Sequence, residues 1–365
     1  MVDWLQLSSN SGIGTTNITI TASTYSGLVD RITSLLVSGV TATSSVLITQ
    51  ERSYEPGGLT FEIISSGTIT WTSISGITID YAIGDTTFGT LSNGDSINVS
   101  AGDYVQFKAT NQRYGTSNSY SYFGGTAYFN VSGNIMSLVY GENFGGQTEL
   151  NQTYVFNGLF RLSNIVDASG LVLPARLITE GSYQNMFYAC TSLTNAPSII
   201  SAQYMDRYAC RYMFAYCSSL TTAPELPADV DGYDSSTSTS HSGVDCYTQM
   251  FYYCTALTTA PSGLPSTSLA TACYTSMFAG CSALTTAPTL PAPTLVTRSY
   301  YYMFYGCSSL SAITCLATAV TATNCTNNWV TDVSSAGTFT KASTMSGWST
   351  GNNGIPSGWT VVDAT

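Results

Sequence analysis

Hydrophobic residues recur in one fixed arrangement through the second half of the chain. Each copy begins with Met-Phe, places Cys three residues after the Phe and Leu three residues after the Cys, and fills the gaps with small or polar residues and Tyr. The copies begin at Met186, Met213, Met250, Met277 and Met303, so the steps between them are 27, 37, 27 and 26 residues. A period of this size predicts a solenoid, in which each unit buries its apolar side against its neighbours.

Each copy contains two local patterns with different expected structures. The Met-Phe-x-x-Cys part has apolar spacings of three and four, which predict a helical turn. The Leu-Thr-Thr-Ala-Pro part favours a short strand, which ends at the proline because proline has no N–H to donate. We expect successive strands to stack as a parallel ladder about 4.8 Å apart.

The first half of the chain has the alternation that is typical of half-buried strands. We expect strands at 17–22, 31–37 and 46–50 in a first domain, residues 1–51. A second β-domain, residues 54–133, has strand patterns at 61–64, 77–81, 96–99 and 104–108. The last two flank Ala101-Gly102-Asp103 and are predicted to form a hairpin.

The remaining boundaries follow from the repeat. Residues 134–158 are expected to be a junction and residues 159–328 the solenoid, whose degenerate first unit begins at Leu159-Phe160 and has Ser163 at the Cys position. A polar first unit suits the end of a solenoid. Residues 228–243 are expected to loop out, and residues 329–365 to form a C-terminal cap.

Two resemblances refine this division. Trp4-Leu5, the turn through Gly12, the strands 18–22 and 46–50, and Arg31-Ile32-Thr33 resemble the BACON domain, an immunoglobulin-like sandwich to which carbohydrate binding is attributed. A structural spacer is the alternative role, because a fold alone does not carry function. The Phe-x-x-Cys-x-x-Leu units resemble BspA-like leucine-rich repeats of bacterial surface proteins, although Thr-Thr-Ala-Pro replaces the usual Ile-rich strand. The expected fold class is mainly β: an Ig-like sandwich, a second β-sandwich-like domain, and a leucine-rich-repeat solenoid with a cap.

Composition narrows the functions. Only 8% of the residues are charged, 12% are aromatic and the net charge is −11. Nucleic-acid binding needs clustered Lys and Arg, and ten basic residues scattered over 365 do not provide that. No apolar run reaches the roughly 18 residues of a membrane span, and the N-terminus lacks a secretory signal pattern. We therefore expect neither nucleic acid nor membrane insertion.

All ten cysteines lie between Cys190 and Cys325. One Cys recurs at the same place in every repeat, which predicts a buried ladder of free thiols. Disulfides within repeats, such as Cys246 with Cys254, are the rival interpretation. Zinc is disfavoured because Cys-x-x-Cys is absent and His241 is the only histidine.

The sequence offers little for catalysis. His241 has no identifiable partner to orient it, and no carboxylate pair recurs in the repeats. The Asp229–Asp234 stretch has some character of a Ca²⁺ loop but lacks the EF-hand glycine and the closing acid, so a solvated loop is favoured. We expect no enzyme activity and no cofactor.

Aromatic residues are the candidate binding groups. Tyrosines that follow the Met-Phe pairs would form a ladder along the solenoid, available to a glycan or another protein chain. The alternative is that they fill gaps between units. The candidate residues are Tyr188, Tyr216, Tyr252, Tyr253, Tyr305, Trp348 and Trp359.

Two functional hypotheses follow. BACON-like domains and BspA-like repeats both occur in proteins of phages that infect gut Bacteroides-type bacteria, crAss-like phages among them, and the combination implies a virion fibre, tail or capsid-decorating protein. Such a protein assembles in the host cytoplasm, contacts other virion proteins and host surface glycan, and is open to self-association. The alternative is an adhesin or carbohydrate-binding protein at the bacterial cell surface.

Overall fold

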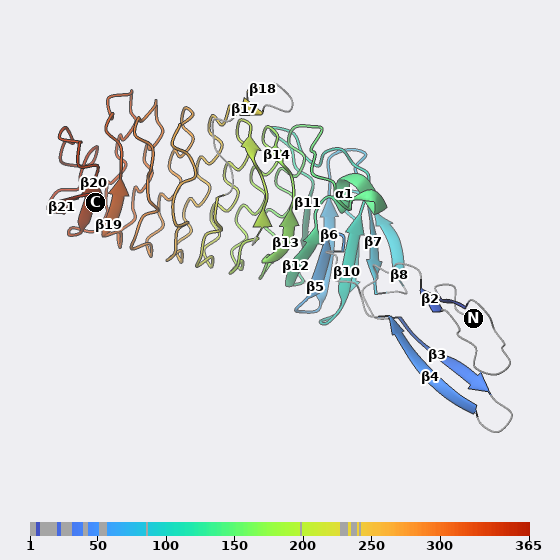
Figure 1. The fold of residues 1–365 in the computed structure, drawn as a ribbon. Helices are drawn as coiled ribbons and strands as arrows, with labels where there is room; N and C mark the ends of the chain where they lie inside the picture. The colour runs from blue at the N-terminus through green and yellow to red at the C-terminus, as the bar shows by residue number, and fades with distance from the viewer. Residues whose placement is uncertain are drawn as a thin grey trace.

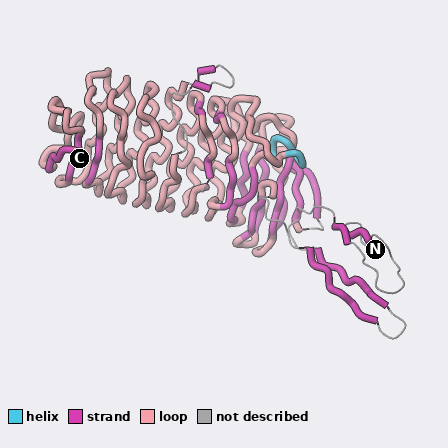
Figure 2. Tube along the Cα trace, viewed as in Figure 1, coloured by secondary structure: helices cyan, strands magenta, loops and turns pink. Residues whose placement is uncertain are grey.

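The computed structural model describes residues 57–84, 87–197, 199–226 and 242–365, and the strand segments 5–7, 20–22, 31–38, 43–50, 233–234 and 239–240. The protein is mainly β, with antiparallel sheets near the N-terminus followed by a β-solenoid of about 7 turns, as the sequence predicted (Figure 1). Figure 2 shows that regular strands gather in the N-terminal part and that turns and loops make up most of the solenoid.

The predicted strands of the first 51 residues are confirmed. β1 (Leu5–Leu7) pairs antiparallel with β2 (Ile20–Ala22), and β3 (Arg31–Ser38) pairs antiparallel with β4 (Thr43–Gln50). Trp4 and Gly12 lie outside the described residues.

The second β-region is a sandwich of two sheets. One sheet contains β5 (Thr60–Ile63), β7 (Ile79–Ile83), β8 (Thr87–Leu91), β10 (Tyr104–Lys108) and β12 (Phe129–Asn134). The other contains β6 (Gly67–Thr72), β9 (Ser96–Val99) and β11 (Tyr122–Gly125). Phe61 and Phe107 from the first sheet pack against Phe123 from the second, with ring centroids 4.8 and 4.7 Å apart. These buried aromatic rings form the sandwich core.

The two strands predicted as a hairpin are divided between the sheets, so that prediction was wrong. β9 pairs with β6, whereas β10 pairs with β5 and β7. The turn at Gly102 (φ 91°) is present, but it carries the chain across the sandwich. Both strands bury alternate residues, and two strands that face each other across a core satisfy that pattern as well as two paired strands do.

A short helical connection leads from the sandwich to the solenoid. It consists of α1 (Ser137–Tyr140) and the 3₁₀ turn η1 (Gly141–Asn143). The Ser137 hydroxyl accepts a hydrogen bond from the Leu59 N–H and donates one to the Phe107 carbonyl, at 2.9 and 3.0 Å. These bonds tie the connection to the sandwich.

One side of the solenoid carries the predicted parallel ladder. Single β-bridges join Asp167 to Asn195, Asn195 to Thr222, and Thr222 to Thr259, all in parallel. Three of these residues lie in the Leu-Thr-x-Ala-Pro segments, so the stacking prediction is confirmed. The longer named strands of the solenoid are β13 (Gly170–Leu173), β14 (Leu177–Ile178), β15 (Ile199–Ile200), β16 (Tyr204–Met205), β17 (Tyr233–Asp234), β18 (Thr239–Ser240), β19 (Ala312–Cys315), β20 (Thr338–Lys341) and β21 (Thr360–Asp363).

The other side, which we call the turn side, is built from β-turns. In the solenoid turns, or rungs, of the five Met-Phe copies there are three consecutive four-residue turns on this side, and not the helical turn that the apolar spacing predicted. In the rung of Met186 they close by N–H to carbonyl hydrogen bonds of 3.0 to 3.2 Å, and their third residues, Gly181, Asn185 and Ala189, have φ of 63°, 53° and 57°. A positive φ at the third residue is the geometry of type II turns. The helical-turn prediction was wrong because these turns bury their first and fourth residues, a spacing that imitates a helix.

Hydrogen bonds between rungs hold the turn side together. The Phe187 N–H donates to the Met213 carbonyl and the Ala189 N–H to the Ala215 carbonyl, both at 2.8 Å. The rungs are numbered one to seven by the residue at the Met position: Leu159, Met186, Met213, Met250, Met277, Met303 and Trp329.

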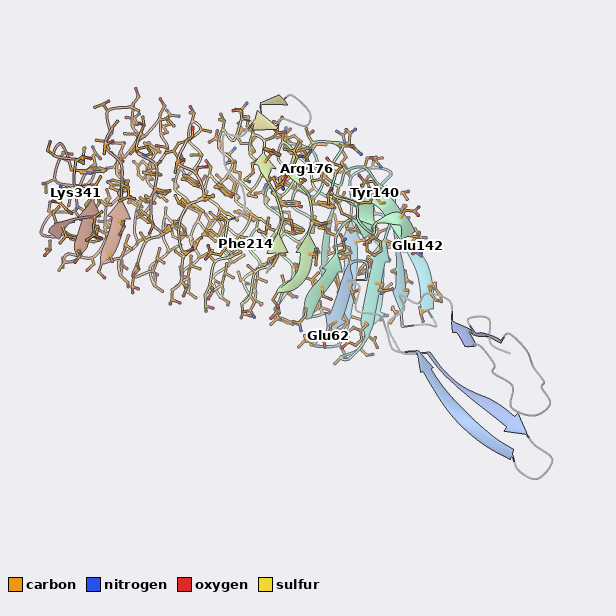
Figure 3. The ribbon with its side chains drawn as sticks, in the orientation of Figure 1. Glu62, Tyr140, Glu142, Arg176, Phe214 and Lys341 are labelled. Atoms are coloured by element: carbon orange, nitrogen blue, oxygen red, sulfur yellow. The ribbon has the colours of Figure 1, made fainter. Side chains whose placement is uncertain are left out.

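Sandwich and solenoid share one continuous core. β12 pairs in parallel with β13, while on the turn side the Phe123 N–H donates to the Leu159 carbonyl at 3.0 Å. Each sheet of the sandwich therefore continues into one side of the solenoid (Figure 1). Inside, the Phe stack begins with Phe123 on Phe160 at 5.9 Å and continues through Phe214, which is labelled in Figure 3.

Candidate functional site

The outward residues of the turn side follow from turn geometry. Because the first and fourth residues of each turn enter the core, the second and third face away from it. On this side of rungs one to six these outward positions carry most of the tyrosines near the Met-Phe pairs. We define the tyrosine face as Tyr120 and Tyr122 of the sandwich with Tyr188, Tyr212, Tyr216, Tyr252, Tyr253, Tyr301, Tyr302 and Tyr305.

The structure brings the five predicted tyrosines onto this face. Tyr188 meets Tyr216 edge-on with centroids 5.4 Å apart, and Tyr216 stacks on Tyr253 at 5.8 Å. Tyr252 lies 5.5 Å from Tyr216. Tyr216, Tyr253 and Tyr305 remain 39%, 44% and 37% exposed. Tyr216 and Tyr253 therefore support each other and still present about two fifths of their surface to solvent, whereas Tyr188 and Tyr252 are half-buried.

Small residues beside the rings explain the alternation of tyrosine with Ala and Gly. A Cβ added to Gly280 would lie 2.8 Å from the Tyr253 ring, and Ala215 and Ala279 are almost fully covered. Gly280 also has φ 78°, which favours glycine. The small side chains thus make room for the rings of neighbouring rungs.

A groove opens in the tyrosine face over rungs one to four. Its volume is about 410 Å³, and it is lined by Tyr120, Arg161, Asn185, Tyr188, Tyr212, Tyr216, Gln249 and Tyr252. Burial is the largest cause of the raised pKa of Tyr216, and the neighbouring phenols of Tyr188, Tyr253 and Tyr212 raise this pKa further. The phenol therefore stays neutral at physiological pH and offers a hydroxyl as both donor and acceptor.

The two tryptophans occupy the other end of the solenoid. Trp348 stacks on Trp329 with centroids 5.6 Å apart and an interplanar angle of 9°. Trp359 is 7% exposed, and its indole N–H donates to the Ser334 carbonyl at 2.8 Å. Both rings close the C-terminal end of the core, and the structure does not bring them to the tyrosine face.

The cysteines of the repeats form the predicted buried ladder. The thiols of Cys190, Cys217, Cys254, Cys281 and Cys307 each donate to the carbonyl of the Phe in the preceding rung, at 2.9 to 3.1 Å. Ser163 holds this position in rung one and bonds the Phe160 carbonyl of its own rung at 2.6 Å. All ten cysteines are free and buried in the structure.

Thiol reactivity is expected to report on this ladder. Burial raises the pKa of Cys254 to about 12, so almost no reactive thiolate exists near neutral pH. We expect a disulfide-exchange reagent at pH 8 to label fewer than about one thiol per native chain within minutes, and all ten in guanidinium. Rapid native labelling, or cysteine pairs linked by disulfides in mass spectra, would contradict the ladder.

The other candidate sites considered from the sequence are the single histidine, a possible calcium loop, metal clusters and membrane spans. His241 and most of the Asp229–Asp234 stretch lie outside the described residues. Among the residues that are described, no group of three or more His, Cys, Asp or Glu side chains could hold a metal ion. Over the same residues, no helix has the length and hydropathy to cross a membrane.

The candidate residues taken from the sequence do not include five of the groove residues: Tyr120, Arg161, Asn185, Tyr212 and Gln249. Arg161 lies 27 residues before Tyr188, so extending the repeat register into the degenerate first unit would have placed it in the same column. Tyr212 lies one four-residue turn before Tyr216. Tyr120 comes from the sandwich, and no pattern in the repeats points to it.

Comparison of the chain with models of known families, with characterised proteins and with solved structures finds no significant match. No function for this chain follows from these comparisons.

Proposed function

We propose that the protein is a non-enzymatic structural and adhesive component of a virus particle, which contacts a host surface glycan through its tyrosine face. The observation that carries the adhesive role is the row of partly exposed tyrosine rings, in contact with one another, along one side of the solenoid. Rings held in this way present contact area at little cost in side-chain entropy. A long row of them suits an extended polymer better than a small metabolite.

The virion role rests on the sequence. The BACON-like and BspA-like resemblances support it, and a charge-poor surface of stacked rungs suits a fibre or decoration protein. Recovery of the protein in purified particles would support this role. Recovery only in outer-membrane or secreted bacterial fractions would favour the alternative, an adhesin of the bacterial surface, and would leave the glycan contact standing.

Removal of two rings is expected to weaken glycan binding. Replacing both Tyr216 and Tyr253 by alanine should reduce affinity for a glycan identified on an array by at least about tenfold, or about 1.4 kcal/mol. The reason is the loss of the two stacked rings that are among the most exposed on the face. Isothermal titration would measure the change.

Phe88→Ala supplies the matched control. Phe88 lies on β8, the edge strand farthest from the solenoid in its sheet, and its side chain is 71% exposed. Its loss should leave affinity unchanged. An array on which the native protein binds nothing would remove the adhesive role and leave a purely structural one.

A further inference from the structure

Arg161 gives the groove a chemical preference. Its guanidinium lies over the Tyr120 ring at 4.5 Å and within about 6 Å of the Tyr188 and Tyr122 rings, at 5.9 and 6.0 Å. A guanidinium held against aromatic rings still has N–H groups that can donate to a ligand. In the described part of the chain no carboxylate forms an ion pair with it. Among the described residues, the groove therefore holds a cation with no carboxylate paired to it.

Charge along the tyrosine face has one sign. At the outward positions of the second and third turns of rungs one to six, the charged residues are Arg161 and Arg211, and none is Asp or Glu. Arg211 lies over the Tyr212 ring at 5.1 Å, and its Nε is buried without a hydrogen-bond partner. The whole chain carries a net charge of −11. A face of this sign on so acidic a protein favours an anionic partner.

The other lining groups suit a sugar. Asn185 and Gln249 provide amides, and the phenols of Tyr188, Tyr212, Tyr216 and Tyr252 provide rings and hydroxyls. A volume of about 410 Å³ lies within the range of ligand sites, roughly 300 to 1,000 Å³. Rings stack on the apolar faces of sugars, amides bond their hydroxyls, and a planar guanidinium matches a carboxylate in a bidentate manner.

From this arrangement we infer that the groove binds a carboxylate-bearing sugar residue, such as a hexuronic acid, within an acidic polysaccharide. Arg161 bonds the carboxylate, and the neighbouring tyrosines stack on the sugar rings. The inference rests on the proposed glycan contact and specifies its substrate class. Nucleic acid is also anionic, but two arginines on one face are too few to neutralise the successive phosphates of its backbone.

The test compares acidic oligosaccharides with their neutral forms. Oligomers of polygalacturonate, hyaluronan and alginate would be titrated into the full chain, each beside the same oligomer with its carboxylates methyl-esterified. We expect at least one acidic series to bind, to lose about tenfold or more in affinity on esterification, and to weaken as salt is raised. Arg161→Gln should remove the preference for the acidic form and leave the weak binding of the ester unchanged.

Arg298→Gln is the matched control, because Arg298 is an exposed arginine on the first turn of a distant rung, 5.9 Å from the Tyr301 ring. It should retain the native preference. Unchanged thermal midpoints would show that both variants fold. Arg161→Lys should lose most of the preference, since lysine keeps the charge but not the planar fork.

The outcomes separate the two proposals. Equal binding of acidic and esterified forms with no effect of Arg161→Gln, or binding of neutral glycans alone, would overturn the acidic-sugar inference and leave the glycan contact standing. Equally tight, Arg161-dependent binding of dextran sulfate would also overturn it, because charge alone would then suffice. Failure of every glycan to bind would sink both.

Discussion

Phe214→Ala is expected to lower the local free energy of unfolding of the solenoid by about 3 to 5 kcal/mol. Phe214 is fully buried and stacks between Phe187 and Phe251, with centroid distances of 5.2 and 5.6 Å and interplanar angles of 5° and 2°. Its removal leaves a cavity with an aromatic ring on each side. The flanking rungs cannot close it, because their backbones are hydrogen-bonded to one another at fixed spacing.

Native-state hydrogen exchange is the suitable measurement, because a chain of several regions need not unfold in one step. The loss of protection should be largest at the amides of rungs two to four and smaller near Trp329, since each rung contacts only its neighbours. Phe214→Leu should cost under about 1.5 kcal/mol, because it retains most of the volume. Tyr305→Ala, on the exposed face, should have little effect. An equal loss of protection along the whole chain would contradict the nearest-neighbour structure.

The core of the solenoid could be predicted because each core position recurs. Phe, Cys and Leu return at fixed places in five copies, and a residue that recurs once per rung stacks on itself. The backbone between them could not be predicted in the same way. A run of four-residue turns buries the same spacings as a helix, and its positive φ angles fall on residues such as Asn185, Ala189 and Tyr216, which give no glycine signal.

In the sandwich, the positions of the strands could be predicted from the sequence but their pairing could not. Strands 96–99 and 104–108 were predicted at the residues where β9 and β10 lie. Their pairing was wrong because alternation identifies the side of a strand that meets the core and carries no information on which strand lies beside it. The parallel joining of β12 to β13, which merges the two regions into one core, likewise has no local signal.

The candidate binding residues also fall into those that the repeat pattern predicts and those that it does not. Tyr188, Tyr216 and Tyr253 could be found because they follow the Met-Phe pairs, whereas Tyr120 reaches the groove from a separate region of the chain. The tryptophans of the C-terminal region were grouped with the tyrosines by residue type alone. In the structure their rings stack on, or lie buried beside, the last rungs of the core. Residue type therefore indicates what a side chain can bind, while its place in the rung decides whether it is presented.

Gly125→Ala is expected to destabilise the junction between sandwich and solenoid by at least about 3 kcal/mol, and Gly124→Ala to leave it unchanged or raise its stability by up to about 1 kcal/mol. Gly125 has φ 115°, and a Cβ there would lie 2.1 Å from the Thr68 carbonyl oxygen, which belongs to a paired strand and cannot move alone. At Gly124, one residue earlier in β11, a Cβ would meet only the Tyr122 ring at 3.7 Å, an ordinary contact. Hydrogen exchange at the amides of β6 and β11 would measure both changes. Because β11 also carries Tyr122 and joins the turn side through Phe123, Gly125→Ala should weaken glycan binding as well. Equal stability of the two variants would show that β11 does not pair with β6 in this register. It would also remove the support that β11 gives to rung one of the solenoid, next to the tyrosine face.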